Sequence, residues 1–372
     1  MQKTILTLMS ALAMLIGFGI QGSANESEPV VQRAMNSVAE RVAEFLDDEN
    51  MQKSIAVGQL QGIPLNLKSS GGVELRRALI HAMEAQGVEV DDDARTSMFG
   101  KFKLVEEKEH FDDDFLTLGI QVDLEFFDEN GSEIQVEEFK IWGRQVLQIA
   151  GLNVDVPSDV SPEKQEREII RQRKNPTTKV DADGVVRNEN PFGVQILVND
   201  GGRISSRAAK LDSRKRPVVE LFSSEEYVVR LHNDADFEVA ASLVIDGVNV
   251  FEMAEDGSVE SNSRFIIQPG KHIDIPGWFI NTKQTRAFEI SGYEGSVAEA
   301  EGIAASSLNV GTISAAFQAS WEVGGERPDD EPRGNPMGGA ATKLGREIEK
   351  EYQPVVRDFG KIRSTISVRY DR

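Results

Sequence analysis

Residues 237–253 read FEVAASLVIDGVNVFEM, and this stretch decides what the second half of the chain becomes. Two apolar runs meet at Asp246 and Gly247, a pair that accepts the left-handed backbone of a two-residue hairpin turn. These two runs and several further strand-like segments follow one another at regular intervals, which is typical of a sandwich or barrel. We therefore predict an all-β, sandwich-like domain over residues 218–372, with a Gly- and Pro-rich loop insertion at about 324–345. The further strand-like segments are 226–233, 264–270, 271–280, 285–292, 311–321 and 364–372.

The segment 364–372 is predicted to be an integral strand of this domain. Ile366, Val368 and Tyr370 alternate with polar residues, which gives the segment one apolar and one polar face. Burying the apolar face outweighs the entropy of closing the loop before it, because that entropy grows only logarithmically with loop length.

Residues 266–280, IIQPGKHIDIPGWFI, hold the most suggestive side chains of the chain. His272 and Asp274 could belong to a catalytic or metal site, and Trp278 could form a binding platform. The Pro-Gly pair before them favours a turn between two strands, and the alternation places His272 and Asp274 on one solvated strand face. No third partner is evident, so we interpret the stretch as two strands with Trp278 in the core.

The first half of the chain alternates helical and strand-like periods, which predicts an α+β domain over residues 30–157. The helical spacing of apolar residues predicts a helix at 30–49, and Asp128 to Gly131 predicts a hairpin turn within 115–143. Apolar residues of the first helix are Val31, Met35, Val38, Val42, Phe45 and Leu46. The other expected elements are a strand at 53–60, a helix at 69–87, and strands at 88–90 and 99–107.

This first domain resembles the curli-secretion and penicillin-binding-protein-activator group of bacterial envelope proteins. The resemblance is carried by SIAVGQLQG (54–62), GGVELRRALIHAMEAQGVEV (71–90), FGKFKLVEE (99–107) and LTLGIQVDLEFFDENGSEI (116–134). It implies a role in the cell envelope. Members of that group are typically lipoproteins, whereas this chain has no cysteine to carry a lipid, so the resemblance implies no anchor or pore here.

The β domain is similar to a β-domain of unassigned function in secreted bacterial proteins. The matching residues are YVVRLHNDADFEVAASLVIDGVNV (227–250), PGKHIDIPGW (269–278) and ISVRYDR (366–372). This resemblance implies no particular chemistry.

Residues 158–217 show weaker periodicity and are interpreted as a connecting region with a few ordered pieces. A Ser-Pro helix start at Ser161 is followed by Ile169 and Ile170 as the apolar face. The part from Arg203 to Arg216 is basic in a chain of net charge −21. It could dock an anionic partner, pack against the acidic first domain or remain a solvated connector, and we favour the last two.

The N-terminus predicts export. Lys3 precedes an apolar run from Ile5 to Ile20, and the small residues Gly22 and Ala24 follow. This pattern is typical of a signal peptide, here residues 1–24 with cleavage after Ala24, and the alternative is an uncleaved anchor. We predict a periplasmic or secreted protein with no transmembrane segment after cleavage. Because the chain has no cysteine, it forms no disulfide and carries no thiol nucleophile.

The acidic composition and the lack of motifs limit the function. A net charge of −21 argues against nucleic acid as a partner. No Walker, HExxH or GxSxG motif occurs, and a G-x-G-x-x-G match at 17–22 lies inside the predicted signal peptide. The acidic runs Asp91–Asp93 and Asp112–Asp114, and the turns at Asp128 and Asp181, lack the ligand spacing of a calcium loop and are interpreted as solvated loops.

We therefore predict no catalytic, cofactor-binding or metal-binding residue. The function we favour is that of a non-enzymatic protein for binding or assembly in the cell envelope, with an envelope or extracellular protein as partner. One alternative is a secreted hydrolase or metal-dependent enzyme, in which His110, Asp112–Asp114 and His272 would converge in one pocket. Another is a structural component of an extracellular assembly.

Overall fold

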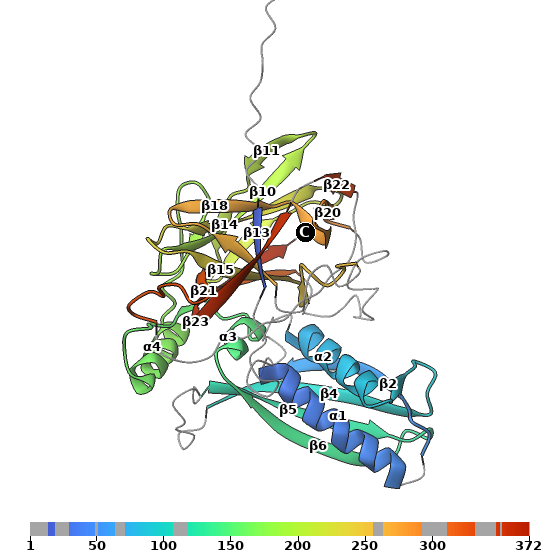
Figure 1. Cartoon of the computed structure of the whole chain (residues 1–372). Helices are drawn as coiled ribbons and strands as arrows, with labels where there is room; N and C mark the ends of the chain where they lie inside the picture. Colours follow the sequence, from blue (N-terminus) through green and yellow to red (C-terminus); the bar gives the residue numbers. More distant parts are fainter. Residues whose placement is uncertain are drawn as a thin grey trace, which may run out of the picture.

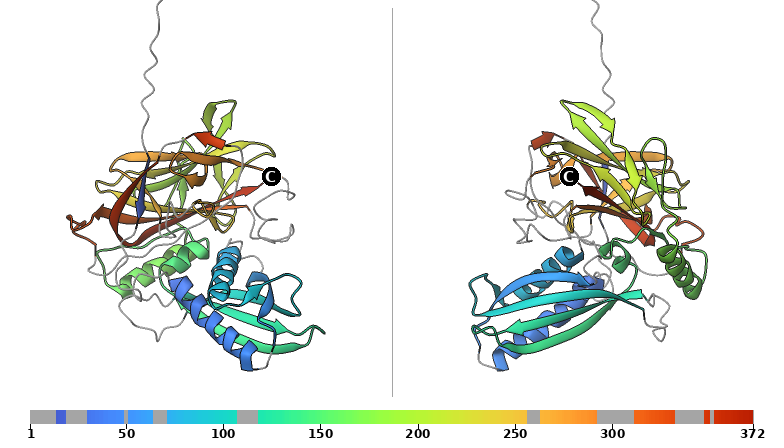
Figure 2. Two further views of the ribbon diagram at one scale, coloured as in Figure 1. Left: turned by 45° about the vertical axis from the view of Figure 1, so that its right-hand side comes forward. Right: turned by 180° about the vertical axis from the view of Figure 1, so that it is seen from behind.

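The fold is mostly β, as predicted. A computed structural model describes residues 14–18, 30–48, 51–63, 71–106, 118–255, 263–291, 311–331, 347–349 and 352–371. Within these residues the strands form three sheets. Figures 1 and 2 show a smaller sheet with two helices at one end of the molecule and two larger sheets at the other.

The smaller sheet has the strand order β3-β2-β4-β5-β6. Its strands and the two helices beside it include every element expected between residues 30 and 143. Its hairpin turn has Gly131 at φ 77°, and the Asp128 carboxylate accepts the backbone N–H of Asn130 at 2.9 Å and of Ser132 at 2.8 Å. The elements are α1 (Val30–Asp48), β2 (Ser54–Ile63), α2 (Gly71–Ala85), β3 (Glu89–Val90), β4 (Thr96–Glu106), β5 (Leu118–Phe127) and β6 (Glu133–Trp142).

Helices α1 and α2 pack on one face of this sheet (Figure 1). The alternation along β4 shows why: Met98 and Phe102 are buried, whereas Phe99 and Lys101 on the opposite face are exposed. A half-covered sheet of this kind needs apolar residues at every second position. The hydrophobic core that results is drawn from residues 31–149 alone.

The two larger sheets are built from strands that are far apart in the sequence. One has the order β1-β17-β15-β21-β23-β13-β12, with β16 and β7 added, and comprises β1 (Met14–Phe18), β7 (Val154–Asp155), β12 (Ala209–Leu211), β13 (Pro217–Glu220), β15 (Val239–Ile245), β16 (Val248–Asn249), β17 (Arg264–Ile267), β21 (Thr312–Glu322) and β23 (Tyr352–Asp371). The other has the order β19-β20-β14-β10-β9-β8, with β11, β18 and β22 added, and comprises β8 (Lys179–Val180), β9 (Val186–Arg187), β10 (Phe192–Asp200), β11 (Arg203–Ser206), β14 (Glu226–Asn233), β18 (Lys271–Ile275), β19 (Gly277–Asn281), β20 (Gln284–Glu289) and β22 (Glu347–Glu349).

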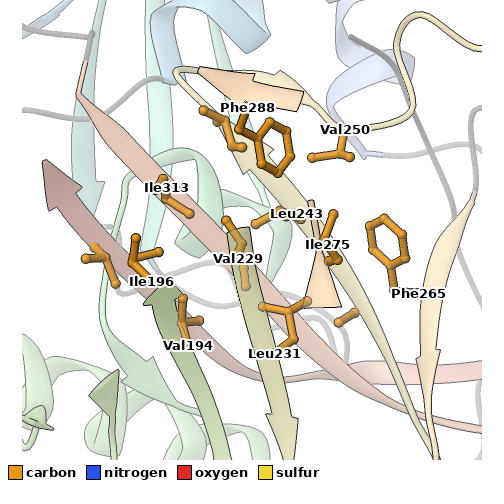
Figure 3. Packing of buried hydrophobic residues seen from close by; sticks show 14 of the residues in the cluster. Val194, Ile196, Val229, Leu231, Leu243, Val250, Phe265, Ile275, Phe288 and Ile313 are labelled. Carbon is orange, nitrogen blue, oxygen red and sulfur yellow. The ribbon is translucent and has the colours of Figure 1, made fainter. Parts of the chain in front are cut away.

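One hydrophobic cluster joins these two sheets (Figure 3). Val194 and Val229 come from one sheet, and Leu243, Phe265 and Ile313 come from the other. The apolar side chains on the inner faces of the two sheets are buried against each other, and this burial holds the sheets together.

The predicted hairpin turn and terminal strand of this part are both confirmed. Asp246 has φ 52° and Gly247 has φ 85°, the left-handed pair that the turn between β15 and β16 requires. In β23, Ile366 and Val368 are fully buried and Tyr370 nearly so. The strand pairs antiparallel with β21 along most of that strand.

The interpretation of residues 158–217 as a connecting region is wrong. Besides α4 (Pro162–Lys174), which begins at the expected Ser-Pro start, these residues supply β8 to β12. Strand β10 is central: it pairs with β14 from Phe192 opposite Asn233 to Asn199 opposite Glu226. Its apolar run is short, and its place in the sheet depends on a partner strand some thirty residues later, which local periodicity does not reveal.

The first part of the chain also enters the larger sheets before the expected boundary near residue 157. Beyond the short helix α3 (Gln145–Ile149), β7 pairs antiparallel with β23. The Arg144 guanidinium donates to the carbonyl of Ile362 at 2.9 Å, and Gln148 accepts a hydrogen bond from the Ser242 hydroxyl at 3.1 Å. Of the expected loop insertion at 324–345, only residues 324–331 lie within the described residues.

Candidate functional site

The suggestive stretch 266–280 forms strands and turns, as predicted, but it contains parts of three strands: the end of β17, then β18 and β19, which are separated at Pro276 where one strand was expected. In β18 His272 is exposed, Ile273 and Ile275 are buried, and Asp274 forms an ion pair with Arg230 on the neighbouring strand, with a distance of 2.5 Å from Nε to Oδ1. Trp278 is 6% exposed and belongs to the core. These residues therefore support a strand face and a core rather than a loop for binding.

His272 lies opposite His232 in this sheet, with ring centroids 5.5 Å apart. The Nε2 atom of His232 is 3.1 Å from Oε1 of Gln195. Burial, and after it the positive charge of Arg187, lowers the pKa of His232 to about 4, so its ring is neutral at pH 7. Within the described residues, no group of three or more His, Cys, Asp or Glu residues is placed to hold a metal ion.

The acidic turns use their carboxylates locally. Asp91 accepts the N–H of Asp93 at 3.0 Å, and Asp181 accepts the N–H groups of Asp183 at 3.0 Å and Val185 at 2.9 Å. Such bonds fix the turn in the way typical of aspartate in loops. His110 and Asp112–Asp114 lie outside the described residues, so their expected meeting with His272 in an enzyme stays an open alternative.

The basic segment Arg203–Arg216, which we call the basic edge, runs from the edge of one large sheet to the edge of the other. Its first part is β11, which among the described strands pairs with β10 alone. Its second part is β12, the last strand of the other sheet, paired with β13. All four residues of β11 are exposed.

Large apolar side chains are exposed on and beside the basic edge. Of the five large apolar side chains exposed in the described residues, three lie here: Ile204 at 50%, Leu211 at 39% and Phe222 at 53%. The guanidinium of Arg207 stacks over the Phe222 ring, 5.3 Å from its centroid, and pairs with Glu225. Large exposed apolar side chains are a common feature of interaction surfaces.

A groove of about 650 Å³ lies beside β11. Its lining includes one basic residue, Arg207, which pairs with Glu225. Asp200 and Glu226 also line it, and Glu226 accepts a hydrogen bond from the Asn199 amide at 3.0 Å. The polar lining would accept backbone groups and charged side chains of an extended polypeptide. Its main lining residues are Asn199, Asp200, Arg207, Ser224, Glu225 and Glu226.

The basic edge does not pack against the acidic first part of the chain. Figures 1 and 2 place β11 at the end of the molecule opposite α1 and the small sheet. Its ion pairs are local: Lys210 is 3.7 Å from Glu220, and Arg216 is 2.6 Å from Asp212. Of the three interpretations of this segment, packing against the first domain is therefore wrong.

A buried carboxylate that sequence reasoning missed has a structural role. Asp155 accepts hydrogen bonds from the Ser364 hydroxyl at 2.7 Å and from the N–H groups of Glu189 at 2.7 Å and Asn190 at 2.8 Å. Burial raises its pKa, but these donors satisfy both oxygens. Asp155 thus fastens β7 to β23 and carries no chemistry of its own.

A second missed group lies where α2 meets the larger sheets. Glu74, in the first turn of α2, lies near Arg264 of β17, and burial raises the pKa of Glu74 to about 7 while lowering the pKa of Arg264 to about 10. Arg77 pairs with Glu252 at the same contact, and Val73 belongs to the core of the larger sheets. No sequence signal joins these residues, because their partners are more than 170 positions away.

The described helices include none that is both long and apolar enough to cross a membrane. No family model, curated protein or solved structure matches this chain.

Proposed function

We propose that this chain is an exported, non-enzymatic protein that binds an envelope or extracellular protein partner through its basic edge. The observation that carries the proposal is β11, a fully exposed edge strand with a large apolar side chain, Ile204, and a basic flank. An extended segment of a partner adds to such an edge by pairing with its backbone.

Charge gives this surface its selectivity. The basic edge has six Lys or Arg residues and one Asp, in a chain of net charge −21. Acidic segments are repelled by the rest of the surface and attracted to this edge, so the field orients a partner as it approaches. The partner we propose is therefore an extended acidic segment of a protein.

We also propose that the chain consists of an α+β domain and a β-sandwich domain. The core of the small sheet lies within residues 31–149, and the core of the larger sheets lies within 186–370 apart from Val73. Two nearly separate cores support two domains. The order of helices and strands in the first domain supports its relationship to the curli-secretion and penicillin-binding-protein-activator group and a place in the periplasm or outside the cell.

Export is tested by the N-terminus of the natively produced protein. Mass spectrometry should find Asn25 as the first residue. A mature protein that retains Met1 to Gly22 would contradict cleavage.

The binding surface is tested with the mature chain, residues 25–372, as bait in envelope extract. Ile204→Asp, or Arg203→Glu with Arg214→Glu, should reduce the recovered partner at least tenfold, and binding of the unchanged chain should weaken as salt is raised. Phe99→Asp is the matched control, because Phe99 is also 50% exposed but lies on the small sheet. Equal losses with Phe99→Asp and Ile204→Asp would exclude the basic edge as the contact.

A further inference from the structure

Strand β1 occupies a position between two other strands of its sheet. It pairs antiparallel with β17, where Leu15 lies opposite Ile266, and parallel with β23, where Leu15 lies opposite Gln353. Through these pairings, β17, β15, β21, β23 and β1 form a closed ring of neighbours. Met14–Phe18 also lies within the segment that export is proposed to remove.

Removal of this segment would leave a gap one strand wide. Residues 352–356 of β23 pair with β1, and the pairing of β23 with β21 begins only at Arg357. On the other side, Arg264 to Ile266 of β17 would lose the same neighbour. Two strand edges would then face each other about 10 Å apart, twice the usual spacing of paired strands.

A cluster of buried apolar residues lies beside the gap. Ala240, Ile266 and Phe359 are buried together, with Val355 packed against them. Ile266 is a register partner of β1, and Val355 lies opposite Gly17. An open gap would therefore expose both unpaired backbone groups and apolar surface, the two features that drive strand addition.

We propose that the gap between β17 and β23 is a strand-acceptor site, filled in the exported protein by a short apolar strand of a partner protein. This proposal rests on the proposed export and cleavage, and it concerns a different surface from the basic edge. The accepted strand runs antiparallel to β17 and parallel to β23, as β1 does.

The sequence of β1, MLIGF, defines the chemistry of the strand that fits. It is uncharged and apolar along its whole length, which suits a site beside a buried apolar cluster. Its glycine lies opposite Arg264, a large, partly buried side chain that interacts electrostatically with Glu74. The partner strand should thus be about five residues long, apolar, and small at its fourth position.

The test uses the mature chain, residues 25–372, and a synthetic peptide of Met14–Phe18 flanked by lysines for solubility. The peptide should bind saturably in fluorescence anisotropy and raise the melting temperature of the mature chain. A control peptide with Leu15→Asp and Ile16→Asp should bind at least tenfold more weakly. Failure of both peptides to bind a chain that begins at Asn25 would overturn the strand-acceptor site and leave export standing.

Register is tested by disulfide formation, for which a chain without cysteine has no background. A peptide carrying Leu15→Cys should cross-link to Ile266→Cys and, separately, to Gln353→Cys, because both are its register partners. Phe265→Cys is one position out of register and should react at least tenfold more slowly. If the Ile266→Cys variant does not fold, the Gln353→Cys variant, on the other side of the gap, still tests the register.

Two further results would overturn the proposal. Equal cross-linking at Phe265→Cys and Ile266→Cys would show that the peptide has no defined place. A native protein that retains Met14–Phe18 would show that β1 is a permanent strand, and this result would also contradict cleavage in the proposed function.

Discussion

Glu331 accepts two hydrogen bonds from the guanidinium of Arg363, at 2.6 Å from Nη2 and 3.1 Å from Nε, and the side chains are 2% and 6% exposed. Arg363 also stacks over the ring of Phe237, 4.7 Å from its centroid. The pair fastens the beginning of the loop insertion to β23. Asp330, which is more exposed, accepts two further hydrogen bonds from the same guanidinium, at 2.8 and 2.9 Å.

We expect Glu331→Ala to lower the free energy of unfolding by about 3 kcal/mol or more, because it leaves a buried guanidinium without its most enclosed partner. Asp330→Ala is the matched control and should cost about 1 kcal/mol or less, because Asp330 is 40% exposed. Urea unfolding of the two variants makes the comparison. Equal losses would show that burial of the partner does not decide the strength of this ion pair.

Glu74 should make the protein less stable as pH rises. Its pKa is about 7 in the folded chain and 4.5 in the unfolded chain, so the folded state favours the protonated form. The contribution is complete below pH 4.5 and is lost as pH rises through 7, by an amount on the order of 3 kcal/mol. Glu74→Gln should remove this slope and make the protein more stable than wild type at pH 8. Urea unfolding at pH 4.5, 6 and 8 checks this, and a slope unchanged by the substitution would contradict it.

His232 should make the protein less stable as pH falls, which is the opposite of the effect of Glu74. Burial lowers its pKa from 6.5 to about 4, so the folded state favours the neutral ring. The stabilising contribution is present above pH 6.5 and is lost as pH falls through 4. His232→Gln should therefore flatten the acid side of the stability profile. His272→Gln, at the exposed neighbouring ring, is the control and should change the profile less.

The terminal strand should be essential for stability. Val368→Asp places a charge at a fully buried position of β23 and should cost about 4 kcal/mol or more, enough to unfold much of the protein. Val323→Asp, at a residue 49% exposed, should change stability by about 0.5 kcal/mol or less. Thermal unfolding of both variants, and of a chain truncated after Arg363, checks this. A truncated chain as stable and soluble as the full mature chain would show that the strand is dispensable.

Local patterns were enough to predict the elements whose own residues specify them. The hairpin at Asp128 to Gly131 and the turn at Asp246 follow from residues that favour the required backbone. The alternation of Ile366, Val368 and Tyr370 predicted the last part of β23 from Ser364 onward, but not its first part, which begins at Tyr352. In each case the residues that determine the element lie within it.

Pairing at long range was not predictable in this way. Strand β10 lies in the predicted connecting region, and its membership in a sheet depends on its pairing with β14. Glu74 and Arg264 lie on a helix and a strand whose meeting is decided by how the two cores pack. The basic edge was noticed for its charge, but its place at a sheet edge came only from the structure.

The position of β23 has a consequence for synthesis of the chain. It pairs with β21, β13, β7 and β1, yet every one of those strands precedes it along the chain. The sheet that contains β23 therefore cannot be completed while residues 352–371 are still in the ribosome, and its other strands emerge before their last partner does. If the chain is exported as we propose, this sheet is still incomplete when the first residues reach the membrane, and it closes only after its last strand has followed.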